Sequence, residues 1–486
     1  MSSPTVSYMA DLYRLMARHE HAHLDEGQHA TADPLDAIMW IHIFLMMFTF
    51  GILFPVGLVL GLTRNRWHVP VQTLGGILTI VGIILGHSHK GRQFESNNIH
   101  AKFSSWILIA AFAQVIFGIY LKLHLTRGIL GRIRSVIVKI HYTIAIILPI
   151  FSWIQICFGV IVIQDFCHAD HLGQCLAHGI MGSSFIAYGY ILTIMLYFGD
   201  RALSNRNKSQ EFYDSLIITL WGIVNTFTEH RWGQNWSHGD YQHTSMGIIW
   251  WCAGMVGIAL SKNWKTGEPK RTFIPALVLI FTGWAMSEHA QHLMISTKVH
   301  AFFGYALMGA GFCRIIEISF LLKDKPSDSK SIKAFQYLPP FLLVESGICF
   351  CGANEEQLAL LNEIGIDHSS YLLVLSSCAF LIFFLILCLI ILYVKLAQDG
   401  DTATNSPSFG EGYSNSWKVV PSSDPNANIE MDSLFDSEAS NSNTITGNNE
   451  NHSSSMPLTS APVRNDSNVV LDYDYDDDVE SLRNIN

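Results

Sequence analysis

Apolar segments long enough to cross a lipid bilayer recur along the first 398 residues of this sequence. A membrane-spanning helix needs about 20 consecutive, mostly apolar residues. Short loops separate these segments, and none has the size of a soluble domain. We therefore predict an all-α membrane protein, a polytopic bundle of about eleven transmembrane helices, at residues 38–61, 69–87, 100–122, 139–163, 178–198, 212–229, 242–260, 273–293, 299–322, 336–352 and 371–396.

The composition supports a membrane location and sets the C-terminal end apart. Charged residues make up 14% of the chain, whereas soluble domains carry about 25%. Residues 399–486 hold about 16 acidic and 3 basic residues, and they account for the net charge of −10. We predict that this acidic segment, rich in Ser and Asn, is a disordered tail that can bind partner proteins or only aid solubility. Its charge argues against nucleic-acid binding.

Lysine and arginine concentrate in alternate loops, and such basic loops usually face the cytoplasm. The pattern predicts an N-terminus in the lumen or outside the cell and a cytoplasmic tail, in the plasma membrane or the endomembrane system (ER, Golgi or vacuole). The basic loops hold Arg64, Arg66, Arg127, Arg132, Arg134, Arg201, Arg206, Lys208, Lys262, Lys265, Lys270, Arg271, Lys323, Lys325, Lys330 and Lys333.

Two features of the predicted lumenal loops fit this orientation. Cys167 and Cys175 lie in one such loop, where a disulfide is allowed. Asn235 begins the glycosylation sequon Asn-Trp-Ser in another. The alternatives are a pair of free cysteines and a chance sequon.

Four histidines lie near the starts of the first four predicted spans. Because successive spans run in opposite directions, His42 and His100 lie at one membrane face, and His68 and His141 at the other. Two histidines that face each other across neighbouring helices are the axial ligands that a six-coordinate haem needs. Two such pairs, one in each leaflet, would form an electron path across the bilayer. The alternative is interfacial histidines that contact lipid headgroups.

The residues around these histidines resemble the transmembrane core of the cytochrome b561 family, especially the domains joined to DOMON modules. The first helix of that core has a His followed by Gly, Pro and Gly, and the second has an aromatic residue and His followed by Gln and Gly. The third has His, Gln and Gly, and the fourth has His and Gly. The matching residues here are His42, Gly51, Pro55 and Gly57; Trp67, His68, Gln72, Gly75 and Gly82; His100, Gln114 and Gly118; and His141 and Gly159.

This resemblance implies a b561-like four-helix core at residues 38–163. It implies two b-type haems, one held by His42 and His100 and the other by His68 and His141, and a cytoplasmic electron donor such as ascorbate. The chain departs from the family in three ways. Pro70 predicts a helix start after His68, Lys102 stands where the family is apolar, and there is no DOMON-like β domain.

The second half of the membrane region carries a separate set of His and Glu residues at predicted lumenal helix ends. Glu288 and His292 are four residues apart and would share a helix face. Such a set can hold a divalent metal such as zinc or relay protons, and the alternative is hydrogen bonding between helices. The candidate metal ligands are Glu229, His230, His243, Glu288, His289, His292 and His300.

Two acids within predicted spans and one N-terminal tract are further candidates for a specific role. Arg314 and Glu317, three residues apart, are expected to neutralise each other, and Glu345 has no partner that the sequence identifies. The N-terminal tract can bind Cu or Zn or can be a solvated amphipathic segment. It contains His19, Glu20, His21, His23, Asp25, Glu26 and His29.

The chain as a whole resembles the fungal Ytp family of multipass membrane proteins, and residues 284–317 are also similar to the vertebrate transmembrane protein 45 family. We divide the chain into a His-rich lumenal segment, a b561-like unit with a fifth helix, a second His-rich membrane unit and the tail. The corresponding ranges are 1–37, 38–200, 201–398 and 399–486.

Three functions compete on this sequence. The first is a transmembrane b-type electron carrier that reduces a lumenal acceptor, such as a ferric or cupric ion or monodehydroascorbate. The second is a metal-ion or proton-coupled transporter that uses the lumenal His and Glu residues. The third is a membrane scaffold or trafficking protein that works through its tail.

Overall fold

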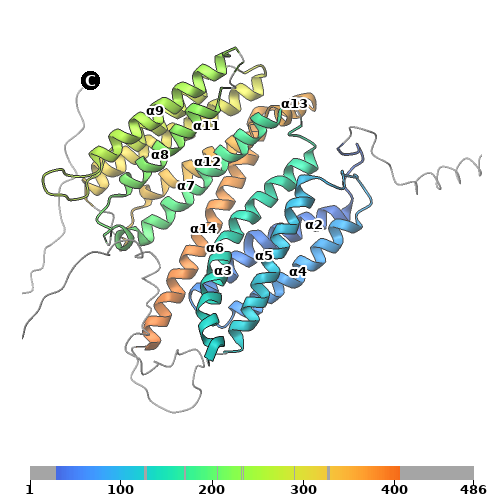
Figure 1. The fold of residues 1–486 in the computed structure, drawn as a ribbon. Helices are drawn as coiled ribbons and strands as arrows, with labels where there is room; N and C mark the ends of the chain where they lie inside the picture. The colour runs from blue at the N-terminus through green and yellow to red at the C-terminus, as the bar shows by residue number, and fades with distance from the viewer. Residues whose placement is uncertain are drawn as a thin grey trace, which may run out of the picture. The chain divides into compact units, whose positions relative to one another are not determined.

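The structure, a computed structural model, describes residues 29–404 except 125–127, 169–170, 205, 231–232, 234, 289–290 and 326–328. These residues form helices and connecting loops, with two isolated β-bridges and no strand among them. The elements in Figure 1 are α2 (Ala37–Phe48), η1 (Thr49–Leu53), α3 (Phe54–Leu62), α4 (His68–Ser88), α5 (Ile99–Lys122), α6 (Gly128–Gln164), α7 (Leu172–Ser204), α8 (Gln210–Thr228), α9 (His238–Leu260), α10 (Ile274–Ser287), α11 (Met294–Ile316), η3 (Glu317–Leu322), η4 (Ala334–Tyr337), α12 (Leu338–Cys351), α13 (Glu355–Glu363) and α14 (His368–Thr404).

All eleven predicted spans fall on helices, which confirms the all-α polytopic fold. In the described part of the chain, nine helices are long and apolar enough to cross a membrane. The other two are α8, whose first turns carry Glu211 and Asp214, and α10, which has only 14 residues. Nine of the eleven predicted spans therefore meet both the length and the hydropathy expected of a membrane-crossing helix. The sequence analysis also missed α13, a short polar helix capped by Asn354.

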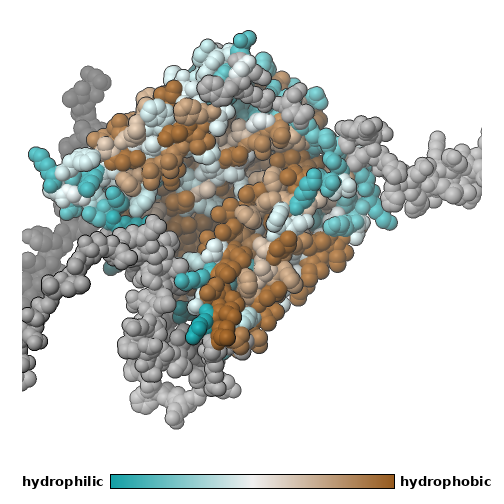
Figure 2. Space-filling view, viewed as in Figure 1, coloured by the Kyte–Doolittle hydropathy of each residue, from teal (hydrophilic) through white to brown (hydrophobic). Residues whose placement is uncertain are grey.

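Apolar side chains cover the sides of the helices, as expected of a surface that faces lipid. Figure 2 shows hydrophobic residues over the helices and hydrophilic residues toward their ends. Phe112, Leu373 and Phe380 are each more than 60% exposed. Such exposure of large apolar residues would be costly in water, so the surface fits the lipid bilayer that the sequence predicts.

The first group of helices, α2–α6, consists of two antiparallel hairpins. One hairpin pairs α2, η1 and α3 with α4, and the other pairs α5 with α6. A π-helical turn at Thr49–Leu53 precedes Pro55. Proline has no backbone N–H to donate, and the π-helical turn lets α2 continue into α3 without a break in the helix. Few side chains are fully buried here, and Ile107 is the one buried residue of α5.

The second group, α7–α12, is packed more tightly, around α11 and α12. Val299, Phe303 and Leu307 of α11 are fully buried, as are Leu343 and Val344 of α12. The predicted boundary at residue 200 places α7 with the preceding helices, but its closest backbone contacts are with α12. α14 contacts α7, α11 and α12 of this group and α3 of the first (Figure 1).

Glycines bring the backbones of neighbouring helices together in the second group. A Cβ atom on Gly182 of α7 would lie 2.6 Å from the carbonyl oxygen of Gly347 on α12. A Cβ atom on Gly304 of α11 would lie 2.5 Å from the carbonyl oxygen of Gly283 on α10. Small residues at such crossings are a common device of membrane helix packing.

The predicted lumenal loops meet at one end of the helices. Cys167 and Cys175 form a disulfide, and the Cys167 N–H donates to Glu356 of α13 (2.5 Å). The ring of His168 stacks on that of His29 at 4.4 Å between centroids, and His29 lies 3.2 Å from Glu95. Loops that the alternation of spans assigns to one side therefore do lie together.

Two acids of the predicted spans, Glu317 and Glu345, have side-chain partners in the structure. Arg314 donates to Glu317 at 2.6 Å, which confirms the expected pair. Ser376 of α14 donates to Glu345 at 2.5 Å, a partner that the sequence did not identify. Helix α14 continues to Thr404, into the start of the tail predicted at 399–486. Residues 1–28 and 405–486, and with them the rest of that tail and most of the N-terminal histidine tract, lie outside the described residues.

Candidate functional site

The two hairpins of the first group bring the four histidines together in two pairs. The rings of His42 and His100 have centroids 6.4 Å apart, with planes at 82°. Those of His68 and His141 are 6.5 Å apart at 88°. Each pair joins one hairpin to the other, because His42 and His68 belong to the first hairpin and His100 and His141 to the second.

Helix boundaries around these histidines differ from the prediction at two points. His68 is the first residue of α4, not a residue outside it. Pro70 fits within this first turn, where backbone N–H groups have no helical partner to lose. His141 lies well inside α6 rather than near its start, because that helix continues through Arg132 and Arg134 beyond the apolar segment.

Backbone carbonyls orient three of the imidazoles. The Nδ1 atoms of His42, His68 and His100 lie 2.7, 2.8 and 3.1 Å from the carbonyl oxygens of Gly82, Gly57 and Gln155. A carbonyl only accepts hydrogen bonds, so Nδ1 carries the proton in the rings of His42 and His68, and Nε2 keeps its lone pair. At His100 the side-chain amide nitrogen of Gln155, a donor, also lies 3.1 Å from Nδ1. Histidines that bind metals usually have this arrangement.

A glycine stands four residues after each of these carbonyls and accommodates the ring. A Cβ on Gly86 or Gly61 would lie 2.8 Å from the ring of His42 or His68, and one on Gly159 would lie 3.2 Å from His100. Residues four apart share a helix face. The carbonyl therefore fixes the ring and the glycine leaves it space.

His141 repeats part of this arrangement on α5. Gly118 approaches its ring, with a Cβ distance of 3.8 Å, and Gln114 stands four residues earlier. The Gln114 amide donates to the His141 carbonyl at 2.9 Å, as that of Gln155 does to the carbonyl of His100. His141 Nδ1 is buried and has no partner within the described part of the chain. The backbone carbonyl of Gln114 stands four residues before Gly118, as the carbonyl of Gln155 that contacts His100 stands four residues before Gly159.

Near His42, the residue that caps α2 also binds the loop that follows α4. Asp36 caps α2 and also accepts the N–H of Lys90 at 2.8 Å. Burial raises the pKa of Asp36, but the N–H groups of Lys90, Met39 and Gly91 and the charge of His89 outweigh it, so this pKa is below its usual value. Burial lowers the pKa of His89, and Asp36 opposes that shift. The sequence analysis missed both residues, since their roles depend on the loop.

The candidate metal ligands of the second half form pairs. His243 lies 3.1 Å from Glu229, and His230 lies 3.1 Å from Asp240. His300 is buried, with Nδ1 2.9 Å from the carbonyl of its own helix at Ser296. No group of three or more His, Cys, Asp or Glu residues that could hold a metal ion exists among the described residues.

The prediction that Glu288 and His292 share one helix face is wrong. α10 ends at Ser287, Glu288 is its C-cap, and His292 lies in the loop before α11. His289 lies outside the described residues. Asn235 is exposed in the loop before α9, where Ser237 of its sequon caps the helix by accepting the Asp240 N–H.

Comparisons with known proteins agree with the membrane fold. The family described as "Protein YTP1-like, C-terminal" matches residues 151–394, and a "Domain of unknown function (DUF2427)" matches residues 22–124. Protein YTP1 of Saccharomyces cerevisiae is 51% identical over 262 residues, which cover 54% of this chain and 56% of that protein. The matched region thus spans little more than half of the length of YTP1.

A second relative aligns over a greater length. The "Uncharacterized membrane protein C3B8.06" of Schizosaccharomyces pombe is 22% identical over 468 residues, covering 71% of this chain and 91% of that protein. The "Uncharacterized membrane protein YCR061W" of S. cerevisiae is 25% identical over 171 residues, 31% of this chain and 27% of its own length. No solved structure matches. Since the first family covers half of the sequence, the chain is a multipass membrane protein that belongs to the YTP1-like family.

Proposed function

We propose that helices α2–α6 bind two b-type haems and that the protein carries electrons across the membrane. His42 and His100 would hold one haem, and His68 and His141 the other. Bound haem supplies a one-electron redox centre at each of two depths in the bilayer. By the distribution of Lys and Arg, electrons would pass from a cytoplasmic donor such as ascorbate toward a lumenal acceptor, a ferric or cupric ion or monodehydroascorbate.

The separation of the paired rings is the observation that carries this proposal. A metal–imidazole bond is about 2.0–2.1 Å long and the ligating nitrogen lies about 1.1 Å from the ring centre, so two imidazoles on opposite sides of one metal have centroids about 6.3 Å apart. The two pairs here have 6.4 and 6.5 Å.

The protein residues around each ring support the same reading. The carbonyls of Gly82 and Gly57 fix the imidazole tautomer that leaves Nε2 of His42 and His68 for the metal. Glycines on the facing helices keep space beside the rings. Interfacial histidines that contact headgroups would need neither feature.

The test is a reduced-minus-oxidised absorption spectrum of the full chain, purified in detergent after expression with ample haem. We expect a b-type α-band and about two haems per chain. His42→Ala with His100→Ala should remove about half of the haem, and His68→Ala with His141→Ala the other half. His87→Ala, an exposed histidine at the end of α4, is the matched control and should keep both. Absence of any Soret or α-band in the wild type would overturn the proposal.

A further inference from the structure

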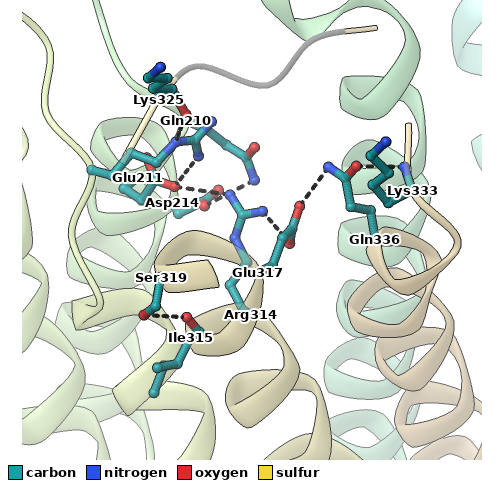
Figure 3. Close-up of polar contacts among 11 residues, drawn as sticks. Gln210, Glu211, Asp214, Arg314, Ile315, Glu317, Ser319, Lys325, Lys333 and Gln336 are labelled. Atoms are coloured by element: carbon teal, nitrogen blue, oxygen red, sulfur yellow. Dashed lines mark hydrogen bonds and ion pairs between the residues drawn. The ribbon is translucent and has the colours of Figure 1, made fainter. Parts of the chain in front are cut away.

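Charged side chains are buried where α8, α10, α11 and α12 meet at one end of the second group (Figure 3). Glu211 and Asp214 lie in the first turns of α8, and Arg271 precedes α10. Arg314 lies in the last turn of α11, and Glu317 begins η3. Glu211 and Glu317 are each 1% exposed and Asp214 is 8% exposed. Charges at this depth are costly unless they are paired.

Two of the three carboxylates are held by arginine. Glu211 Oε1 accepts from Arg271 at 2.7 Å and from Arg314 at 2.9 Å. Arg314 also donates to Glu317 at 2.6 Å, and Gln336 donates to the other oxygen of Glu317 at 3.1 Å. Figure 3 shows Arg314 between these two carboxylates. Each of these two carboxylates therefore has a charged hydrogen-bond partner.

Asp214 is the third carboxyl and has different partners. It contacts Gln210 at 3.5 Å and the hydroxyl of Tyr188 on α7, and none of the ion pairs found in the described residues includes it. The second oxygen of Glu211, Oε2, is buried and has no hydrogen-bond partner within the same residues. Glu211, Asp214 and Tyr188 line one cavity of about 10 Å³, the space of a water-sized molecule.

The charges of this cluster do not balance when every group is ionised. Three carboxylates face two guanidinium groups, which leaves one negative charge in a low-dielectric site. One proton on Asp214 removes that charge. Glu211 and Asp214 are three residues apart on one helix face and line the same cavity, so a proton on Asp214 can serve as the donor that Glu211 Oε2 lacks. Two carboxyls in one small buried cavity favour one proton over two charges.

We propose that Asp214 and Glu211 form a proton-binding site, in which Asp214 holds one proton at neutral pH and shares it with Glu211 Oε2. Protonation forms an O–H bond on Asp214, and deprotonation transfers that proton to water at this helix end. The charged and titratable groups around them are Tyr188 from α7 and Arg314 from α11, which line the cavity, and Arg271 before α10 and Glu317 from η3, which pair with Glu211 and Arg314. Helix α12 presents apolar Pro339 and Leu343. Arg314 lines the same cavity and disfavours a metal cation there.

An infrared measurement on the full chain in detergent tests this proposal without a variant. At pH 7 the exposed carboxyls are ionised, so a carboxylic-acid C=O band identifies a buried protonated group. We expect such a band to shift in protein labelled with ¹³C-aspartate and to disappear as the pH is raised. The label separates Asp214 from Glu345, another buried acid. A spectrum at pH 7 without a label-sensitive C=O band would overturn the proposal.

Two variants then assign the band and its energetic effect. Asp214→Asn should abolish the band, whereas Glu363→Gln, an exposed acid on α13, should leave it unchanged. The thermal midpoint of the wild type should fall as the pH rises from about 4, where an unfolded carboxyl ionises, to the pH at which the folded state loses its proton, since over that range the folded state binds a proton that the unfolded state has released. Asp214→Asn should flatten that decline. A band that persists in Asp214→Asn, or an equal decline in both proteins, contradicts the assignment.

Discussion

Glycine has different neighbours in the two groups of helices. In α2–α6, the glycines that need space face side chains: Gly86 and Gly61 lie against the rings of His42 and His68. In α7–α12, several glycines face the backbone of a neighbouring helix: Gly182 lies against the carbonyl oxygen of Gly347, and Gly304 against the carbonyl oxygen of Gly283. The first arrangement leaves space beside an imidazole, and the second lets two helix axes approach.

This difference explains the unequal burial of the two groups. Close backbone approach lets side chains of α11 and α12 interlock, and Val299, Phe303 and Leu343 are fully buried. The paired histidines hold the hairpins of the first group at a distance set by two rings. One group is thus packed for stability, and the other is shaped around its histidines.

The largest expected effect comes from a methyl group added where two backbones meet. In Gly182→Ala the new Cβ would lie 2.6 Å from the Gly347 carbonyl and 2.8 Å from the Cys351 nitrogen. Backbone cannot swing aside, so α7 and α12 must separate, at a cost of about 1–3 kcal/mol in the free energy of unfolding. Equilibrium unfolding in mixed micelles measures it.

Gly179→Ala on the same helix is the matched control, since nothing lies within 4 Å of its Cβ. We expect it to be neutral or to stabilise the protein by about 0.5–1 kcal/mol, because alanine is the better helix former. Equal losses in the two variants would show that close approach at Gly182 is not what holds α7 to α12.

The first group should respond in cofactor binding rather than in stability. In Gly86→Ala the new Cβ would lie 2.8 Å from the ring of His42, and that ring can rotate away from the Gly82 carbonyl. We expect the unfolding free energy of haem-free protein to change by less than about 1 kcal/mol, while about half of the haem α-band of the wild type is lost. Gly76→Ala, whose Cβ has open space, should keep the full band. A loss of stability like that of Gly182→Ala would remove the distinction between the groups.

Local sequence patterns predicted most of the helices and little of their pairing. Apolar length located all eleven segments, and the three-residue spacing identified Arg314 with Glu317. Length alone misplaced the start of α6, because its helix continues through a polar turn. It also extended α10 through Glu288, where the chain leaves the helix.

The contacts that define the two sites lie far apart in the sequence. Glu211 and Arg314 are 103 residues apart, and His42 and the Gly82 carbonyl are 40 apart. No local period specifies such pairs. Which glycines face a ring and which face a backbone depends on how the hairpins pack. The family resemblance singled out the histidines together with Gly57, Gly82, Gly118 and Gly159, but not which ring each of these glycines contacts.

The smallest expected effect concerns the end of the first group, which a cap joins to a loop. Asp36 accepts the N–H of Met39, at the start of α2, and that of Lys90, each at 2.8 Å. Asp36→Ala should cost about 1 kcal/mol, the usual value of an N-cap, and speed hydrogen exchange in residues 37–40 and 89–93. Because the pKa of Asp36 is below its ordinary value of 3.8, its contribution is present above that pH and is lost as the pH falls below it.

Asp33→Ala is the control for this cap, because the Asp33 carboxylate is exposed and accepts from the hydroxyl of Thr31 at 3.1 Å in its own loop. It should change neither exchange rate nor stability measurably. Exchange in α7 and α12 should also stay slow in Asp36→Ala, since backbone contacts along their length hold those helices. If the loss at Asp36 instead spread to α7 and α12, the two groups would unfold as one unit, and their different packing would not make them independent.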